Sequence, residues 1–318
     1  MPTVSVQIVT YNSSADIVDC LSAVLAQTHK LEQIIVIDNA SADDTVEQVR
    51  SMIMKEQVSI KLVENTVNTG FAPAHNQALS LSSSDYALVL NPDVRLQPDY
   101  IEQIISYMEE EPQMGGATGL LLRQPATDTV DSTGLVLNSI WRAFDRGAGD
   151  QAEKWKQSGS VFGPSGAAAI YRRTMIEDIS VQGQFFDEDF FAYKEDVDVA
   201  WRAQLLGWKS YYCAGAVGYH KRGWKKGGRS SQPLFIRRKS YINRYKMIYK
   251  NLSGLSWLKS LPKFLVYEIA ANGYFLLREP KVLGAWWELI IEIPRLKEKR
   301  NEVKGKQRIK RETIEKQK

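Results

Sequence analysis

The sequence predicts an α/β fold over residues 1–220, with a mostly parallel central sheet flanked by helices, and a basic helical extension over residues 221–318. The first hundred residues alternate apolar runs typical of strands with amphipathic segments typical of helices, which indicates a parallel, three-layer sheet. The chain of 318 residues is 44% hydrophobic and 25% charged, an ordinary globular composition that excludes a wholly disordered or collagen-like protein. Its net charge changes sign near residue 220, which separates the two parts.

Four strands and the helices between them are expected in the first 110 residues. Runs rich in β-branched residues predict the strands, at 4–9, 33–37, 58–63 and 86–90. Ser13 or Ser14 is placed to cap the helix after the first strand, and Ser41 to cap the helix after the second. Further helices are predicted at 72–81 and 98–110.

The later part of the α/β region is less regular. It predicts a strand at 167–171, a helix at 195–206, and a strand at 208–213 with a short continuation at 217–220. Asp198 and Arg202 are four residues apart, so we expect them to form an ion pair on the helix surface.

The charge is distributed unevenly along the chain. Residues 1–220 contain 15 Lys and Arg against 29 Asp and Glu, a net charge of −14, whereas residues 221–318 contain 26 against 8, a net charge of +18. An acidic body with a basic end favours a partner of negative charge, either a membrane surface or a nucleic acid. No nucleic-acid recognition motif accompanies the basic residues, so we expect no nucleic-acid partner.

The basic part also mixes aromatic and charged residues in a way that predicts contact with a membrane surface. The apolar stretch 255–293, which includes Trp257, Phe264 and Trp287, is interrupted by lysines and glutamates and is unsuited to crossing a bilayer. It resembles interfacial helices that lie among lipid headgroups, although a helical cap on the catalytic core or a dimer contact would have the same composition. With no secretory signal visible, we expect a cytoplasmic protein on the inner face of the cell membrane. Cys20 and Cys213 fit no metal or redox spacing and are expected to be reduced, buried thiols.

Polar residues follow each of the first four predicted strands. In parallel sheets ligands bind beyond the carboxyl ends of the strands, so these residues are the first candidates for a site. Tyr11 offers a ring for stacking on a base, and Asp38 could accept a hydrogen bond from a pyrimidine N3–H, although a half-buried Tyr and a capping Asp would explain the same residues. Asp93, held by Pro92 after the fourth strand, suits Mg²⁺ or Mn²⁺, although Asn-Pro-Asp is also common in turns.

Two further residues have a candidate chemical role. Asp196 lies at a predicted helix start, where a carboxylate could accept a proton from a substrate hydroxyl, although first-turn acids such as Asp196 and Glu195 are often structural. His220 ends an apolar strand and could complete a metal site, although a lone histidine is more often structural. The other histidines, His29 and His75, are expected to be structural.

The order and spacing of several blocks resemble glycosyltransferase family 2. The blocks are VSVQIVTYNSSADIVDCL, QIIVIDNASADDT, NTGFAPAHNQAL, ALVLNPDV and FFDEDFFAYKEDVDVAWRAQLLGW followed by AGAVGYH, and the last pair is similar to rhamnosyltransferase-like bacterial members. The resemblance covers about residues 3–220. It implies a GT-A fold, a Rossmann-like nucleotide-sugar-binding and catalytic domain at 1–220, and an inverting transfer from a nucleotide sugar.

The resemblance also implies roles for individual residues. It implies that Asp196 is the general base and that Asp93 and His220 are ligands of a Mg²⁺ or Mn²⁺ ion. The family's DxD motif appears as Asn91-Pro92-Asp93, so Asn91 brings no charge to it. The donor-binding residues it implies are Thr10, Tyr11, Asn12, Asp38, Asn68, Gly70, Asn76, Asn91 and Asp93. Those on the acceptor side are Gly166, Glu195 and Trp141.

The resemblance leaves the substrates open. A dTDP-L-rhamnose donor and a lipid-linked or polysaccharide acceptor of bacterial cell-surface glycan synthesis are expected first. A UDP-linked galactofuranose or hexose is the alternative donor, because Asp38 would read uracil and thymine alike. The alternative outside the enzymes is a binding or scaffold protein with a basic tail and without turnover. The basic residues Lys221, Arg222, Lys225 and Lys226 are expected to close over the diphosphate or to meet an acceptor phosphate, although a solvated loop is as compatible with the sequence.

Overall fold

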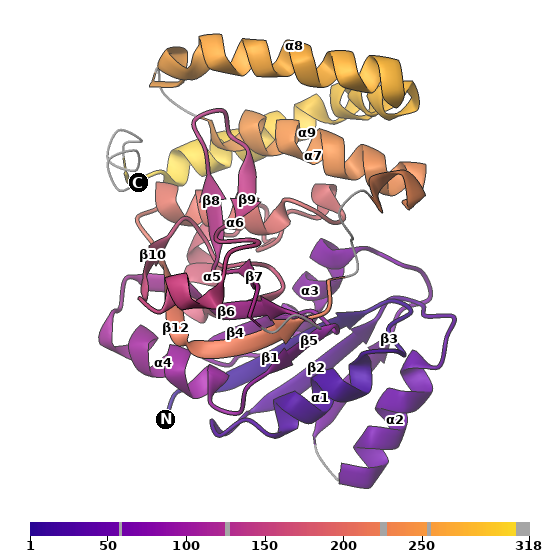
Figure 1. Cartoon of the computed structure of the whole chain (residues 1–318), viewed down its shortest axis with the longest axis vertical. Coiled ribbons are helices and arrows are strands. Elements are labelled where there is room, and N and C mark those ends of the chain that lie inside the picture. The colour runs from indigo at the N-terminus through magenta and orange to yellow at the C-terminus, as the bar shows by residue number, and fades with distance from the viewer. Residues whose placement is uncertain (57–58, 125–127, 223–227, 253–255, 310–318) are drawn as a thin grey trace.

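A computed structural model of the chain describes residues 1–318 except 57–58, 125–127, 223–227, 253–255 and 310–318 (Figure 1). Among these residues the central sheet has ten strands, eight of them on one path in the order β10-β12-β6-β11-β4-β1-β2-β3. One half of the path is parallel and consists of β1 (Val4–Thr10), β2 (Gln33–Asp38), β3 (Ile60–Glu64) and β4 (Tyr86–Leu90). Their carboxyl ends therefore meet at one edge of the sheet, as the sequence predicts.

The other half of the sheet is mixed. Its strands on the main path are β6 (Met114–Arg123), β10 (Gly159–Val161), β11 (Ala168–Arg172) and β12 (Lys209–His220). β11 runs antiparallel to both β4 and β6, and β12 runs parallel to β6. The short strands β5 (Val94–Leu96) and β7 (Val130–Ser132) pair with β12 and β6, and β8 (Leu135–Leu137) pairs with β9 (Ala143–Asp145) in a separate hairpin. The antiparallel β11 brings its amino end to the edge where β4 ends.

Helices cover both faces of the sheet and bury its apolar residues. One face packs against α1 (Ile17–Leu25), α2 (Thr45–Glu56) and α4 (Tyr100–Glu110). The other packs against α3 (Phe71–Ser80), α5 (Arg173–Ile179) and α6 (Glu195–Leu205). Short 3₁₀ helices lie at η1 (Ala152–Trp155), η2 (Glu188–Phe190), η3 (Gly228–Ser231), η4 (Ser256–Ser260) and η5 (Pro280–Gly284).

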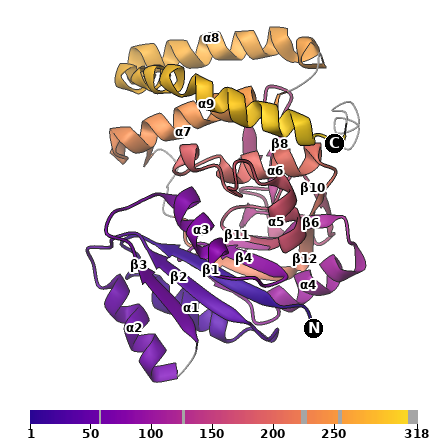
Figure 2. The same ribbon diagram turned by 180° about the vertical axis from the view of Figure 1, so that it is seen from behind.

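Three long helices follow the sheet and lie on the side of α6 away from it. They are α7 (Leu234–Asn251), α8 (Leu261–Arg278) and α9 (Ala285–Lys306), and α8 is the outermost layer of the molecule in both views (Figures 1 and 2). α7 packs on α6 and on α9. None of the described helices is long and apolar enough to cross a membrane.

Several predictions about single elements need correction. Asp198 and Arg202 do pair, at 2.9 Å, but both side chains are buried and the pair lies inside the molecule. Neither Ser13 nor Ser41 caps a helix, because α1 begins at Ile17 and α2 at Thr45, and the Ser41 hydroxyl donates to Asp38. The two predicted strands at 208–213 and 217–220 are one strand with a register irregularity after Cys213, and both cysteines are buried free thiols, as expected.

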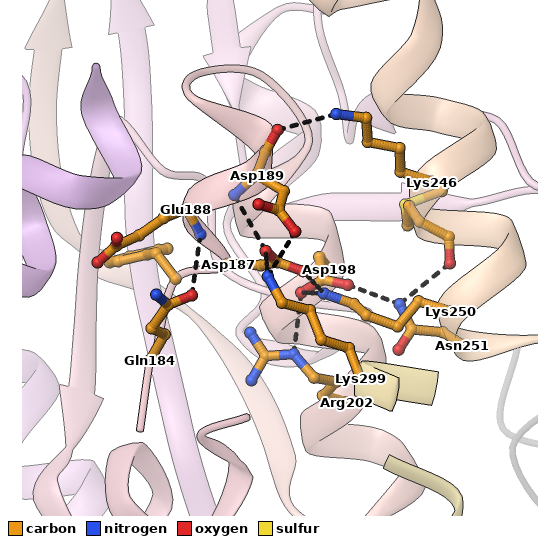
Figure 3. A network of polar contacts seen from close by, with 12 residues as sticks. Gln184, Asp187, Glu188, Asp189, Asp198, Arg202, Lys246, Lys250, Asn251 and Lys299 are labelled. Atoms are coloured by element: carbon orange, nitrogen blue, oxygen red, sulfur yellow. Dashed lines mark hydrogen bonds and ion pairs between the residues drawn. The ribbon is translucent and has the colours of Figure 1, made fainter. Parts of the chain in front are cut away.

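A buried network of ion pairs joins α7 and α9 to the segment before α6 (Figure 3). The Lys299 ammonium lies 2.5 Å from Asp187 and 2.7 Å from Asp189, and Lys250 bonds to Asp187 and, at 2.8 Å, to Asp198. Burial opposes ionisation of Asp187, but the charges of Lys250 and Lys299 outweigh it and hold its pKa well below the usual range. The C-terminal helices are therefore part of the folded core.

This network makes a specific stability prediction. Lys299→Ala removes one of the two charge partners of Asp187 and one of the two of Asp189, which keep Lys250 and Arg295 respectively. We therefore expect it to lower the free energy of unfolding by about 3 kcal/mol, the lower end of the cost of breaking a buried pair. Lys297→Ala is the matched control, because Lys297 lies on the same helix and is exposed. Urea denaturation of both variants measures the difference, and an equal effect of the two changes would contradict the prediction.

Candidate active site

Asp93 and His220 face one another at the edge where β4 ends. Asp93 lies in the turn after β4, and His220 is the last residue of β12, which pairs there with Val94 of β5. The imidazole Nε2 lies 3.3 Å from Asp93 Oδ1. That oxygen is buried, so its charge is costly unless a neighbouring group such as this imidazole compensates it.

Asp131 contacts the other nitrogen of the imidazole, Nδ1. It is not among the residues predicted from the sequence. Its Oδ2 lies 2.8 Å from His220 Nδ1, and the Asp131 side chain is fully buried on β7. Arg222 lies 3.0 Å and Arg123 3.4 Å from its Oδ1. Burial lowers the pKa of His220, but hydrogen bonds to Asp131 and Asp93 and their charges outweigh it and raise the pKa to about 9. The carboxylate fixes the ring and aims Nε2 at Asp93, an arrangement typical of metal-ligating histidines.

The pair fits a divalent cation. Two neighbouring ligands of an octahedral ion with bonds of about 2.1 Å lie about 3 Å apart, close to the separation of Asp93 Oδ1 and His220 Nε2. No group of three or more His, Cys, Asp or Glu in the described part of the chain forms a complete metal cage. Mg²⁺ and Mn²⁺ sites that also bind phosphate need only one or two protein carboxylates, so the remaining ligands can be phosphate and water oxygens.

Asp196 reaches the same edge from α6. Its Oδ2 accepts a hydrogen bond of 3.3 Å from the Gly166 N–H, at the amino end of β11. The next residue, Ala167, accepts a 2.9 Å hydrogen bond from the Asn91 N–H at the end of β4. Gly166 and Ala167 therefore link Asp196 to the Asn91-Pro92-Asp93 turn, so the Asp196 carboxylate and the Asp93–His220 pair lie at the same edge of the sheet.

Burial raises the pKa of both acids at the start of α6. Burial, and then the charge of Asp196, raise the pKa of Glu195 to about 8, so Glu195 is protonated near neutral pH. Burial also raises the pKa of Asp196, which makes its carboxylate a better proton acceptor than an exposed aspartate. Glu195 is buried and Asp196 is only partly so, which leaves Asp196 as the acid that a substrate can reach.

A strained segment before α6 presents Asp196. Phe191, Tyr193 and Lys194 have φ values of 62°, 73° and 76°, which non-glycine residues rarely adopt. The Asn243 amide of α7 donates to the carbonyls of Phe190, Ala192 and Tyr193, at 2.8–2.9 Å. α7 therefore contributes to holding the backbone that leads into the candidate base.

The expected donor-binding residues at the ends of β1 and β2 do lie together. Tyr11 is 53% exposed, so its ring is free to stack on a base. Asp38 is only 2% exposed and accepts from the Thr10 hydroxyl and from the Ser41 hydroxyl and N–H. Asn12 accepts from the Ala42 N–H. A carboxylate has about four acceptor positions, so a base N3–H would use the one that these three donors leave.

The side chains of other expected site residues are used in contacts within the protein and are not available to a substrate. Asn76 uses its oxygen and its amide N–H groups on Phe186 and Glu188, and Trp141 is 2% exposed with its ring against Phe264 of α8. The structure therefore gives no support to donor binding by Asn76 or to acceptor binding by Trp141. Asn68 accepts from the Gly70 N–H, and Gly70, with φ 95°, lies so close to Phe191 that a Cβ would sit 2.6 Å from it. Gly70 thus allows the strained segment to approach.

The start of the basic loop is anchored at this edge. The Lys221 ammonium lies 2.8 Å from Asp16, its N–H donates to the Asp93 carbonyl, and Arg222 lies 2.5 Å from Asp145. Lys225 and Lys226, for which phosphate contact and a solvated loop are both compatible with the sequence, lie outside the described residues.

Comparison with known proteins assigns the chain to a family. The model for glycosyl transferase family 2 matches residues 5–180, more than half of the chain, so the chain belongs to that family and the resemblance seen in the sequence is confirmed.

Among curated proteins, poly-beta-1,6-N-acetyl-D-glucosamine synthase of Staphylococcus aureus (strain COL) is 28% identical over 202 residues, which is 64% of this chain and 46% of that protein. The synthase of Staphylococcus epidermidis is 23% identical over 265 residues, 78% of this chain and 60% of that protein. The chain thus spans about half of the length of these relatives.

Solved structures show the same fold. Staphylococcus aureus TarS residues 1–349 in complex with UDP-GlcNAc superpose with a TM-score of 0.59 at 15% identity, over 96% of this chain and 88% of that one. GalNAc-T7 with UDP, GalNAc and Mn²⁺ gives a TM-score of 0.59 at 14% identity, over 90% and 58%. A mannosyltransferase of Pyrobaculum calidifontis with GDP-Man and Mn²⁺ gives 0.57 at 17% identity, over 92% and 75%. The predicted GT-A fold with a C-terminal helical region is confirmed.

The position of Asp131 makes a testable prediction. Asp131→Asn keeps a side chain of the same shape beside His220 Nδ1 but removes its charge, so we expect Mn²⁺ to bind about 10–100-fold more weakly. Isothermal titration with Mn²⁺ alone measures the affinity. Asp128→Asn, at an exposed position three residues earlier, is the control. Equal affinity of the two variants would show that Asp131 does not support a metal ligand.

Proposed function

We propose that the chain is an inverting glycosyltransferase that moves a sugar from a nucleotide sugar to a hydroxyl group of a lipid-linked or polysaccharide acceptor. The observation that supports the proposal is the pair of hydrogen bonds through Gly166 and Ala167 that links Asp196 to the turn carrying Asp93, opposite His220. A displacement at the anomeric carbon with inversion needs one base on the acceptor side and stabilisation of the leaving diphosphate on the other. The site offers both within one edge of the sheet.

In the proposed reaction the protein binds, orients and moves one proton. Tyr11 stacks on the base of the donor, and Asp38 accepts its N3–H. Asp196 takes the proton of the acceptor hydroxyl. At the same time the acceptor oxygen forms a bond to the anomeric carbon, and the bond between that carbon and the diphosphate breaks. Asp93 and His220 would hold a divalent cation, which supplies positive charge to the leaving diphosphate. Mn²⁺ in the solved structures of GalNAc-T7 and the mannosyltransferase supports Mn²⁺ or Mg²⁺ as that ion.

The first donor that we propose is dTDP-L-rhamnose, on the similarity of residues 185–220 to rhamnosyltransferase-like sequences. A UDP-linked sugar is the second candidate, supported by the relatives named as N-acetylglucosamine polymer synthases and by TarS with UDP-GlcNAc. We further propose that the reaction belongs to cell-surface glycan synthesis and takes place in the cytoplasm, at the inner face of the membrane.

A panel of nucleotide sugars with Mg²⁺ or Mn²⁺, scored for release of the nucleoside diphosphate, tests the proposal. Asp196→Asn removes the proton acceptor while keeping the shape of the side chain, so we expect turnover to fall by about 10²–10⁴-fold. Asp44→Asn is the matched control, an exposed acid just before α2. Near-full turnover by Asp196→Asn would refute the base assignment. Failure of every donor, together with glycan binding, would favour a scaffold without turnover.

A further inference from the structure

The outermost helix, α8, exposes a set of aliphatic side chains to solvent. Val266, Ile269 and Leu277 are 71%, 74% and 83% exposed, and Leu265 and Leu276 are 49% and 62% exposed. Their spacing of three, four and seven residues places them along one stripe. None of the 18 residues of α8 is buried. An aliphatic stripe of this kind normally faces a core or a partner.

The inward side of α8 combines aromatic contacts, of Phe264 with Trp141 and of Phe275 with Tyr241, with hydrogen bonds to α7. Glu268 accepts from Arg244 of α7 at 2.5 Å and from the Tyr245 hydroxyl, and Asn272 accepts from the Tyr241 hydroxyl at 2.5 Å. These bonds fix the rotation of the helix about its own axis. The outward direction of the apolar stripe is therefore a property of the packed structure.

The first turns of α9 continue the pattern. Trp287, Ile290 and Ile291 are 69%, 53% and 66% exposed, again with helical spacing. η5 connects the end of α8 to the start of α9 and contacts both. In both views α8 lies at the end of the molecule opposite α2 (Figures 1 and 2).

The charges around the stripe are sorted by sign. Within residues 258–297 every exposed charged side chain is basic, namely Lys259, Lys263, Arg278, Lys281, Arg295 and Lys297. The acids of the same range are at least partly buried and paired with basic residues, as Glu279 is with Arg237 and Glu292 with Lys246. The outward charge around the stripe is therefore mostly positive, with Arg295 paired to Asp189 and the exposed acid Glu298 following Lys297.

We propose that α8 and the first turns of α9 form a docking face for an anionic lipid bilayer. Apolar side chains enter the boundary between headgroups and acyl chains, and the surrounding lysines and arginines attract the headgroup phosphates. A second copy of the chain fits less well, because it would bring two basic rims together. The inference deepens the proposed function, since it names the surface that would keep the site near lipid-linked acceptors.

Vesicle co-sedimentation with the full chain tests the docking face. Vesicles of phosphatidylcholine with phosphatidylglycerol should bind the protein, and vesicles of phosphatidylcholine alone should bind it more weakly. Ile269→Gln/Leu277→Gln removes two exposed apolar groups and should weaken partitioning at least about tenfold. Met54→Gln is the control, because Met54 on α2 is 74% exposed, like Ile269, but lies at the other end of the molecule.

The outcomes separate this inference from the proposed function. Weaker vesicle binding by the double variant, with sugar transfer to a water-soluble acceptor unchanged, supports the docking face. Equal vesicle binding by the double variant and the wild type, or no binding to anionic vesicles, overturns it whatever the turnover. A dimer in sedimentation velocity that the double variant loses would also overturn it, in favour of a second copy.

Discussion

The ion-pair network between the acidic segment before α6 and the lysines of α7 and α9 is the constraint on which the rest of the structure depends. Without Lys250 and Lys299, Asp187 would be an uncompensated charge inside the protein, and Asp189 and Asp198 would keep only Arg295 and Arg202 as charge partners. A buried pair contributes little net stability over an apolar core, but it is costly to break. The network therefore acts mainly by allowing one arrangement of the C-terminal helices on the α/β body.

That arrangement matters because the same segment leads to the candidate base. Residues 191–194 adopt backbone conformations that the chain would not choose alone, and such strain persists only where the surroundings fix it. The Asn243 amide fixes it from α7, and the Ala72 N–H of α3 donates to the Phe191 carbonyl at 3.1 Å. The basic C-terminal part, which the sequence sets apart by charge, is thus physically coupled to the position of Asp196.

The sequence was sufficient to predict which edge of the sheet carries the site. It was not sufficient to predict the residues that hold the site residues in place. The alternation of strands and helices predicts that Asp93 lies where strand ends meet. Asp196 starts a helix, and its role beside Asp93 was implied by the resemblance to the family. Asp131 could not be predicted, because its place depends on a three-residue strand in an irregular region. The spacing of Asp198 and Arg202 indicated their pairing but not their burial, which comes from Lys250 and Asn251 on α7. Trp141 and Asn76 carried no local sign that their side chains are used in packing and in holding the chain.

The central claim is that one edge of the sheet holds both the cation and the base. Anomalous diffraction from crystals grown with Mn²⁺ and UDP tests it most directly. The account predicts one Mn²⁺ peak within bonding distance of Asp93 Oδ1 and His220 Nε2, with the diphosphate on it and the Asp196 carboxylate facing the same cleft. A Mn²⁺–diphosphate complex bound away from the end of β4, or an Asp196 carboxylate turned away from it, would contradict the account.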